Sequence, residues 1–219
     1  MRLQLAVYID MRAFIYTGGM IHPDNITEHP KAEDVCIAAD SGYHNAQKLG
    51  ERVDILIGDF DSIGTVPHDD ISDIRKVPAE KDLTDTQIAL EIAVEQGADE
   101  VIIIGGLGGR LDHTLANLGI LEDMFERHIH GYATDGQNRV HFIRSTSTLI
   151  ARSAYKYISL LPADEVVKSV TMEGGKYPLK NQHLRRRTSG FSTSNEITGN
   201  VVFISVKKGG LYIIESRDT

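Results

Sequence analysis

With 219 residues and a hydrophobic content of 41%, the chain can form one large domain or two small ones with buried cores, and disorder is not expected. Its formal net charge of −8 repels phosphate backbones and anionic lipid, which argues against a nucleic-acid or membrane partner. The basic run Arg185, Arg186 and Arg187 is typical of a solvated surface. Neither a signal peptide nor a membrane-spanning stretch is recognisable, and the single cysteine, Cys36, lies in an apolar stretch. We therefore expect a cytoplasmic protein without disulfides.

The first two-thirds of the chain alternates short β-branched runs with amphipathic stretches, a pattern typical of strand–helix units around a parallel sheet. The expected strands are residues 13–16, 35–39, 54–57 and 101–104. Two helices are expected, at residues 85–96 and 111–125. Their apolar side chains recur at helical spacing and should lie against the sheet: Ile88, Ala89, Ile92 and Ala93 in the first, Leu115, Leu118 and Leu121 in the second.

After about residue 144 the pattern changes to alternating strands separated by turn residues, with no convincing helix. The expected strands there are residues 157–161, 166–172, 201–206 and 211–214. We therefore predict an α/β domain with a mostly parallel sheet at residues 1–144. A small all-β domain, an antiparallel sandwich, should follow at residues 145–219.

Two aspartates, Asp59 and Asp61, directly follow the third predicted strand. Ligands of open α/β sheets bind beyond the carboxyl ends of strands, where carboxylate oxygens can hold Mg²⁺ or Mn²⁺. An isolated Asp-x-Asp would be better explained as a turn. This pair is accompanied by Asp40 after the preceding strand and by Asp82 and Asp85 before the next helix. Five carboxylates in one cleft would need a divalent cation or a cationic substrate to balance their charge.

A structural explanation is available for part of this acidic set. Thr84 or Asp82 is a suitable N-cap for the helix expected at residues 85–96, and the helix dipole favours Asp85 in the first turn. Capping explains one of these residues but hardly all of them.

A glycine-rich loop follows the strand expected at residues 101–104, with the sequence Gly105-Gly106-Leu107-Gly108-Gly109-Arg110. Glycines let backbone amides approach a phosphate, and the start of the following helix adds partial positive charge. The spacing fits neither the Walker A motif nor the dinucleotide fingerprint. A mere tight connection needs fewer glycines, so we interpret the loop as a phosphate site. Asp112 beside it would then need a metal, ribose hydroxyls or a positive group, and His113 has the simpler alternative of a helix-surface residue.

Taken in order, these motifs resemble those of the thiamin pyrophosphokinase family. The matching segments are Ala39-Asp40-Ser41-Gly42, Gly58-Asp59-Phe60-Asp61-Ser62, Lys81-Asp82-Leu83-Thr84-Asp85 and Gly105-Gly106-Leu107-Gly108-Gly109-Arg110-Leu111-Asp112-His113. Two later segments, Gly175-Lys176-Tyr177 and Gly190-Phe191-Ser192-Thr193-Ser194-Asn195, are similar to the second-domain signature of that family. The resemblance covers nearly the whole chain from Ala13. Ser41 stands where many members have glycine, and residues 1–12 have no clear counterpart.

The resemblance implies transfer of the terminal diphosphate of ATP to the hydroxyl of thiamin, with Mg²⁺ or possibly Mn²⁺. It also implies a homodimer whose active sites lie between subunits. By position, the implied metal and catalytic carboxylates are Asp59, Asp61 and Asp85, and Arg110 would stabilise charge on the phosphates. The implied nucleotide site comprises Asp40, Lys81, Asp82, Thr84, Gly106, Gly108, Gly109, Arg110, Asp112 and His113. The implied thiamin contacts are Ser192, Ser194 and Asn195, with Tyr177 or Phe191 as a stacking face or as ordinary core.

The nucleotide motifs alone do not identify the acceptor. A pyrophosphokinase of another small alcohol, such as a hydroxymethylpterin, stays open on those motifs, as does a metal-dependent glycosyltransferase. A non-catalytic sensor of thiamin or nucleotide is a candidate from another class. The second-domain segments favour thiamin, and the full acidic set favours an enzyme over a sensor.

Overall fold

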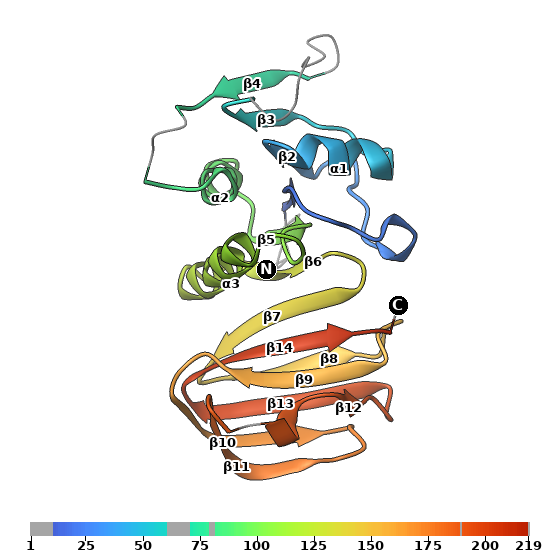
Figure 1. Ribbon diagram of the computed structural model, residues 1–219, viewed down its shortest axis with the longest axis vertical. Helices are drawn as coiled ribbons and strands as arrows, with labels where there is room; N and C mark the ends of the chain where they lie inside the picture. Colours follow the sequence, from blue (N-terminus) through green and yellow to red (C-terminus); the bar gives the residue numbers. More distant parts are fainter. Residues whose placement is uncertain (1–10, 61–70, 79–81, 189, 219) are drawn as a thin grey trace, which may run out of the picture.

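The computed structural model describes residues 11–60, 71–78, 82–188 and 190–218, apart from the side chain of Phe191. Two of the predicted site residues, Asp61 and Lys81, lie outside these ranges. Figure 1 shows the α-helices in the upper half of the molecule and stacked strands in the lower half. In the described part of the chain, no helix is long and apolar enough to cross a membrane.

The upper half is built on six parallel strands in the order β4-β3-β2-β1-β5-β6. Their bounds are β1 Arg12–Tyr16, β2 Val35–Ala39, β3 Ile55–Gly58, β4 Asp73–Lys76, β5 Glu100–Ile104 and β6 His130–Thr134. The four strands expected from apolar runs are confirmed as β1, β2, β3 and β5. Strands β4 and β6 were not predicted, because neither carries a continuous apolar run.

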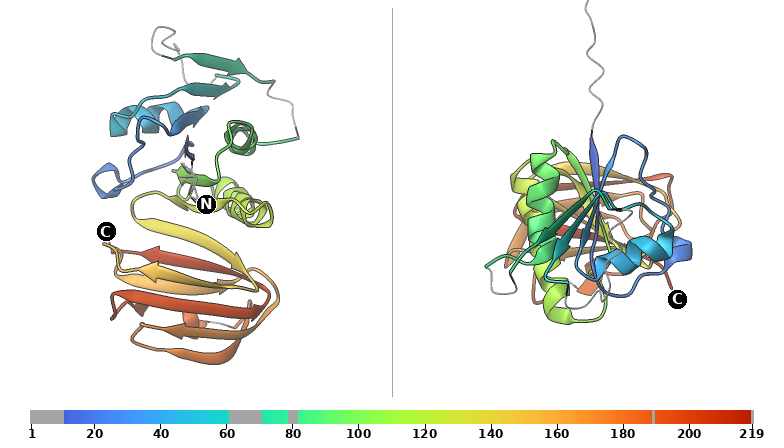
Figure 2. Two further views of the ribbon diagram at one scale, coloured as in Figure 1. Left: turned by 180° about the vertical axis from the view of Figure 1, so that it is seen from behind. Right: turned by 90° about the horizontal axis from the view of Figure 1, so that it is seen from above.

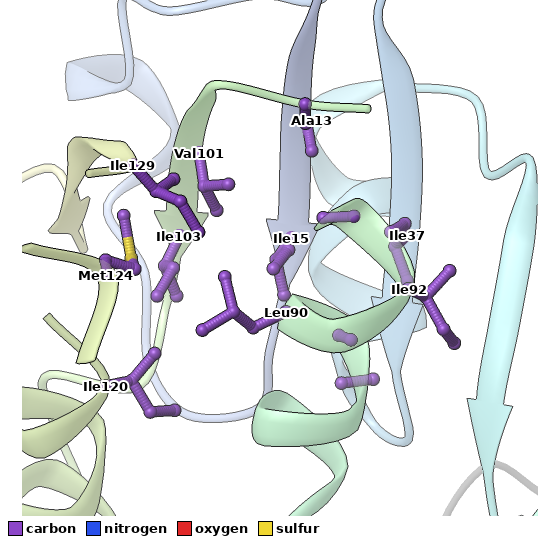
Figure 3. Packing of buried hydrophobic residues seen from close by; sticks show 14 of the residues in the cluster. Ala13, Ile15, Ile37, Leu90, Ile92, Val101, Ile103, Ile120, Met124 and Ile129 are labelled. Atoms are coloured by element: carbon purple, nitrogen blue, oxygen red, sulfur yellow. The ribbon is translucent and has the colours of Figure 1, made fainter. Parts of the chain in front are cut away.

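Three helices cover the two faces of this parallel sheet: α1 Gly42–Leu49, α2 Asp85–Glu95 and α3 Leu111–Glu126. Alternate residues of β1 enter opposite cores, since Ala13 and Ile15 pack with α2 and α3 while Phe14 and Tyr16 pack with α1. Figure 2 shows α2 and α3 on one side of the sheet and α1 on the other. Figure 3 shows how Leu90 and Ile92 of α2 reach the side chains on their face of the sheet.

The interpretation of the second predicted helix needs a correction. Leu115, expected to face the sheet, is 59% exposed. The buried face of α3 consists of Asn117, Ile120, Leu121 and Met124. A polar residue in the buried stripe hid the true periodicity, and α1 was not predicted because its buried stripe also includes a polar residue, Asn45.

The lower half is an antiparallel sandwich, as expected after residue 144, but one of its layers continues the parallel sheet. The ten-stranded sheet has the order β12-β9-β14-β7-β6-β5-β1-β2-β3-β4. Its antiparallel strands are β7 Asn138–Arg144, β9 Tyr157–Pro162, β12 Asn195–Glu196 and β14 Gly210–Ser216. The fold is therefore a large mixed sheet with few helices, joined to a second, antiparallel sheet.

The second layer of the sandwich is a four-stranded sheet in the order β11-β10-β13-β8. Its strands are β8 Ser147–Ala151, β10 Val166–Glu173, β11 Leu179–Arg185 and β13 Val201–Lys208, and short 3-10 turns occur at Pro23–Asn25 and Gly190–Ser192. Strands β9, β10, β13 and β14 correspond to the four predicted there. A separate apolar core lies between the two layers. The predicted division at residues 144 and 145 falls between β7 and β8 and stays a prediction.

Two further expectations from composition are confirmed. Cys36 is fully buried in β2, where burial raises the pKa of its thiol to about 12. Arg185, Arg186 and Arg187 are all exposed to solvent.

A buried carboxylate lies where the two halves of the large sheet meet. Glu215 of β14 is 0% exposed. It accepts a hydrogen bond from Ser153 Oγ at 2.9 Å, and its Oε2 lies 3.2 Å from His141 Nε2 and 3.6 Å from a guanidinium nitrogen of Arg139. Burial by itself would raise the pKa of Glu215, but hydrogen bonding and charge from His141, with the charge of Arg139, lower it below the ordinary value.

Arg139 extends this cluster toward the parallel half. It forms an ion pair with Glu28, which precedes β2, and its guanidinium lies 4.9 Å from the ring centroids of both Tyr132 and Tyr155. Stacking between two aromatic faces suits the planar, weakly hydrated guanidinium. The cluster thus joins segments from both halves of the chain through one arginine.

We expect Glu215→Gln to lower the free energy of unfolding at pH 7 by about 2 kcal/mol, because it removes one of the two carboxylates that face the partly buried Arg139 and weakens the buried contacts with Ser153 and His141. The folded-state pKa of Glu215 is depressed, so its contribution is present above the unfolded pKa, near 4.5, and is lost as the pH falls through the folded value. Urea unfolding between pH 3 and pH 7 should therefore show a weaker acid-side dependence in the variant. Glu173→Gln, at an exposed position, is the control. Identical pH profiles for wild type and Glu215→Gln would contradict this assignment.

Candidate functional site

A pocket of about 550 Å³ opens at the carboxyl ends of the parallel strands. Five chain segments form its wall: the loops after β1, β2 and β5, the approach to α2 with its first turn, and one side of α3. Most predicted nucleotide-site residues that the structure describes line it: Asp40, Asp82, Thr84, Gly106, Gly108, Gly109, Arg110 and His113. Asp85 of the predicted metal set lines it as well. The pocket therefore lies where ligands of open α/β sheets bind.

The acidic side of the pocket is formed by Asp40, Asp82 and Asp85. Asp40 has a left-handed backbone with φ of 47°, a conformation that aspartate tolerates better than most residues. The backbone of Gly58 packs against Asp40, since a Cβ on Gly58 would lie 3.2 Å from Asp40 Oδ1. Asp59 follows this contact directly but is not part of the pocket wall. Among the residues that the structure describes, no three acidic, histidine or cysteine side chains form a ready metal cluster.

The glycine loop after β5 forms another wall of the pocket. Gly105, Gly106 and Gly109 have φ values of 98°, 70° and 92°, which favour glycine at each position. Two of the loop amides are already used: Gly105 N donates to Thr134 O at 2.8 Å, and Gly106 N donates to Gly18 O at 2.9 Å. Phosphate contacts from this loop would therefore come from the later amides that line the pocket, at Gly108 and Gly109.

Arg110 reaches the pocket from the N-cap position of α3 and is paired with Asp112. The closest nitrogen–oxygen distance is 2.6 Å, and both side chains are exposed. Hydrogen bonding from Arg110 lowers the pKa of Asp112 to about 2. A positive group beside Asp112 is thus present in its neighbour Arg110, and Asp112 does not line the pocket itself.

Comparison with known proteins identifies this arrangement. Residues 27–133 match the family model described as "Thiamin pyrophosphokinase, catalytic domain", and residues 146–211 match "Thiamin pyrophosphokinase, vitamin B1 binding domain". The chain is 34% identical over 201 residues to a thiamine pyrophosphokinase of Bacillus subtilis, covering 90% of this chain and 93% of the relative. The chain belongs to the thiamin pyrophosphokinase family.

Solved structures named as thiamin pyrophosphokinases have the same fold. The Bacillus subtilis structure aligns with a TM-score of 0.83 at 28% identity, over 95% of this chain and 100% of that one. The Geobacillus thermodenitrificans structure aligns with a TM-score of 0.80 at 29% identity, over 95% and 98%. A structure from Candida albicans has a TM-score of 0.77 at only 16% identity, over 95% and 90%, which speaks for the fold alone.

The thiamin contacts implied by the family resemblance lie in the sandwich, and none of them lines the 550 Å³ pocket. Asn195 is 4% exposed and is bonded both ways to the backbone of Tyr177, at 3.0 Å and 2.6 Å. Ser192 is also 4% exposed and donates to Leu160 O at 2.6 Å. Both side chains are thus buried and hydrogen-bonded to the backbone of their own chain, which stabilises the local fold. Ser194 and Tyr177, by contrast, are exposed.

Several residues of the pocket were not predicted from the sequence. The loop Thr17-Gly18-Gly19 lies beside the glycine loop, and Thr86 and Asn117 complete the wall. A signal for the first loop was available, because a Gly-Gly pair follows the first predicted strand after one intervening residue, Thr17. A buried asparagine or threonine inside a helix gives no such signal, since its partners come from distant segments.

The start of α2 shows which of the two candidate residues, Thr84 or Asp82, is the helix N-cap. Thr84 Oγ1 accepts from Gln87 N at 3.2 Å, and Gln87 Oε1 accepts from Thr84 N at 2.8 Å, which completes a capping box. Asp85 is the first helical residue, where the helix dipole favours a negative charge. Thr84 is therefore the N-cap, and it lines the pocket as well.

We expect Thr84→Ala to lower the free energy of unfolding by about 1 kcal/mol, because the capping hydroxyl is lost. Thr84→Ser retains the hydroxyl and should stay close to wild type in urea unfolding. Unchanged stability of Thr84→Ala, combined with weaker ATP binding, would assign the hydroxyl to the ligand instead of the cap.

Proposed function

We propose that this enzyme transfers the terminal diphosphate of ATP to the hydroxyl of thiamin in the pocket at the carboxyl ends of the parallel strands, giving thiamin diphosphate and AMP. The observation that carries the site assignment is a single pocket in which a glycine loop and Arg110 meet three carboxylates. That combination suits a polyphosphate together with the charges that balance it. The volume of about 550 Å³ is within the range of ligand pockets for small molecules.

ATP is the co-substrate, and we assign its phosphates to the glycine-loop side of the pocket. Gly108 and Gly109, Arg110 and the start of α3 supply amides, a guanidinium and the positive end of a helix dipole there. Arg110 can leave Asp112 for a phosphate with little cost, because both side chains are exposed and each remains solvated during the exchange. His113 lies on the same side of the pocket.

The carboxylates fit a hard divalent cation. Asp85 lines the pocket, and Asp59 directly follows Gly58, whose backbone packs against Asp40. Both side chains offer carboxylate oxygens, the ligand type that Mg²⁺ or Mn²⁺ prefers. The part of Asp61 in this set rests on the family resemblance alone. Such a cation would neutralise charge that develops on the transferred phosphates.

In the proposed reaction, the hydroxyethyl oxygen of thiamin forms a bond to the β-phosphorus of ATP. The bond from that phosphorus to the α–β bridging oxygen breaks, and AMP leaves with that oxygen. The hydroxyl proton passes to a nearby carboxylate or to water. Phosphoryl-type transfer depends mainly on positioning and charge stabilisation, and we assign these roles to Arg110 and the glycine-loop residues that line the pocket.

Thiamin carries a positive thiazolium ring, for which the acidic wall of Asp40, Asp82 and Asp85 is a suitable surface. We further propose that residues 1–144 act as the catalytic domain and residues 145–219 as the thiamin-binding domain of a homodimer with shared active sites. The exposed side chains of Tyr177 and Ser194 lie outside the pocket wall, which is consistent with a partner subunit supplying them. A cytoplasmic location remains part of the proposal and rests on the single buried thiol of Cys36.

The direct test of function is mass spectrometry of the products formed from ATP, Mg²⁺ and thiamin. We expect thiamin diphosphate and AMP in equal amounts. Asp85→Asn should reduce the rate by about 100-fold or more while the circular dichroism spectrum stays native, because a charge-balancing carboxylate is lost from the pocket. Formation of ADP with thiamin monophosphate, or transfer only to a hydroxymethylpterin, would contradict the proposal.

Shared active sites can be tested by subunit exchange. Asp85→Asn should inactivate the catalytic half, and Ser194→Arg should block the thiamin half with bulk and a charge that repels thiazolium. In an equal mixture that exchanges at random, half of the dimers are mixed, and each has one intact site of two. Activity should recover to about a quarter of the wild-type value. If native mass spectrometry finds mixed dimers and activity does not recover, each site is formed within one chain.

A further inference from the structure

Two glycine loops at the pocket are bonded to each other and form one unit. The first, Thr17-Gly18-Gly19, follows β1, and the second, residues 105–109, follows the neighbouring strand β5. Thr17 N donates to Ile104 O at 3.0 Å, and Gly106 N donates to Gly18 O at 2.9 Å. A Cβ on Gly19 would lie 2.9 Å from Gly108 O, so the two backbones are closely packed. A displacement of either loop therefore displaces the other.

Asn45 of α1 holds this unit from one face of the sheet. Its side-chain amide donates to Thr17 O at 2.8 Å and to Gly19 O at 3.0 Å, so both N–H groups are used on the first loop. The same nitrogen would lie 3.2 Å from a Cβ on Gly105, which shows that it also abuts the second loop. Asn45 is 2% exposed, yet it does not line the pocket.

Contacts from the opposite face complete the support. Asn117 of α3 donates to Gly106 O at 3.0 Å, and the hydroxyls of Thr17 and Thr86 lie 2.9 Å apart. Asn117, Thr17 and Thr86 all line the pocket, so each of them also faces whatever binds there. Asn45 differs because any effect it has on a ligand must pass through the backbone of the loops.

We propose that Asn45 is a positioning residue for ATP: it sets the placement of both glycine loops, and thereby the affinity for ATP, without touching ATP. This inference rests on the proposed function, because it takes the pocket to be the nucleotide site. Without the two donors, the carbonyl groups of Thr17 and Gly19 each lose a hydrogen bond next to a buried side chain. The side-chain amide that links these two carbonyls is also lost. The loop amides then move away from the positions in which they would bind phosphate oxygens, and even a small displacement of this kind lowers the affinity for ATP.

The test compares Asn45→Leu with Ala46→Gly. Leucine has a similar shape and lacks both N–H groups, whereas Ala46→Gly destabilises the same helix at the fully buried neighbouring position, where the side chain has no hydrogen-bonding group. We expect Asn45→Leu to raise the KM for ATP by about tenfold and to change the KM for thiamin by less than about twofold. The dissociation constant for ATP alone, from calorimetry without thiamin, should rise by a similar factor. Ala46→Gly should change neither constant.

An unchanged ATP constant in folded Asn45→Leu, or an equal rise in Ala46→Gly, would overturn the inference. If Asn45→Leu does not fold, Asn45→Ser takes its place, because it loses one of the two donors and leaves a smaller side chain. Wild-type protein that binds no ATP would instead refute the proposed function. If wild-type protein binds ATP and the Asn45 variant binds ATP with the same dissociation constant, only this inference is refuted.

Discussion

The reversal of strand direction between β6 and β7 is the constraint on which both halves of the molecule depend. Strand β6 pairs in parallel with β5 on one edge and antiparallel with β7 on the other, where Ala133 faces Val140 and Thr134 faces Arg139. Thr134 Oγ1 donates to Asn138 O at 2.8 Å, and Asp135 Oδ1 accepts from the amides of residues 137 and 138. The same Thr134 supplies the carbonyl that holds Gly105 N. The turn that starts the sandwich is thus bonded directly to the loop of the pocket.

Near this junction the buried carboxylate of Glu215 and the guanidinium of Arg139 lie next to groups of opposite charge. Glu215 is enclosed by hydroxyl, imidazole and guanidinium partners, and Arg139 has carboxylates on two sides and aromatic rings on its faces. Burial of unmatched ions costs several kcal/mol each, so such a cluster specifies one arrangement of the strands that carry it. The pocket is built differently. Its carboxylates gather at one wall and its guanidinium is exposed, which leaves room for ligands to supply part of the balance.

The sequence predicted the parts of the fold that depend on local pattern. Apolar runs identified β1, β2, β3 and β5, and the rule for strand ends correctly predicted that Asp40 and the glycine loop lie at one pocket. Patterns failed where a polar side chain is buried for a tertiary reason. Asn117 interrupted the apolar stripe of α3, and Asn45 did the same for α1. The structural roles of Ser192 and Asn195 were equally hidden, because their partners, Leu160 and Tyr177, lie in other segments.

The pair formed by Arg110 and Asp112 has a consequence for any anion that enters the pocket. Asp112 is ionised throughout the neutral range, as Arg110 lowers its pKa still further below the ordinary value, so the incoming anion meets a guanidinium whose charge is already balanced. Its binding is then an exchange of partners rather than the capture of a lone cation. The net binding free energy is only the difference between the interaction of Arg110 with the anion and its interaction with Asp112. This difference grows with the number of charges that the anion carries. Because both side chains are exposed, the resulting preference for polyanions over singly charged anions is small.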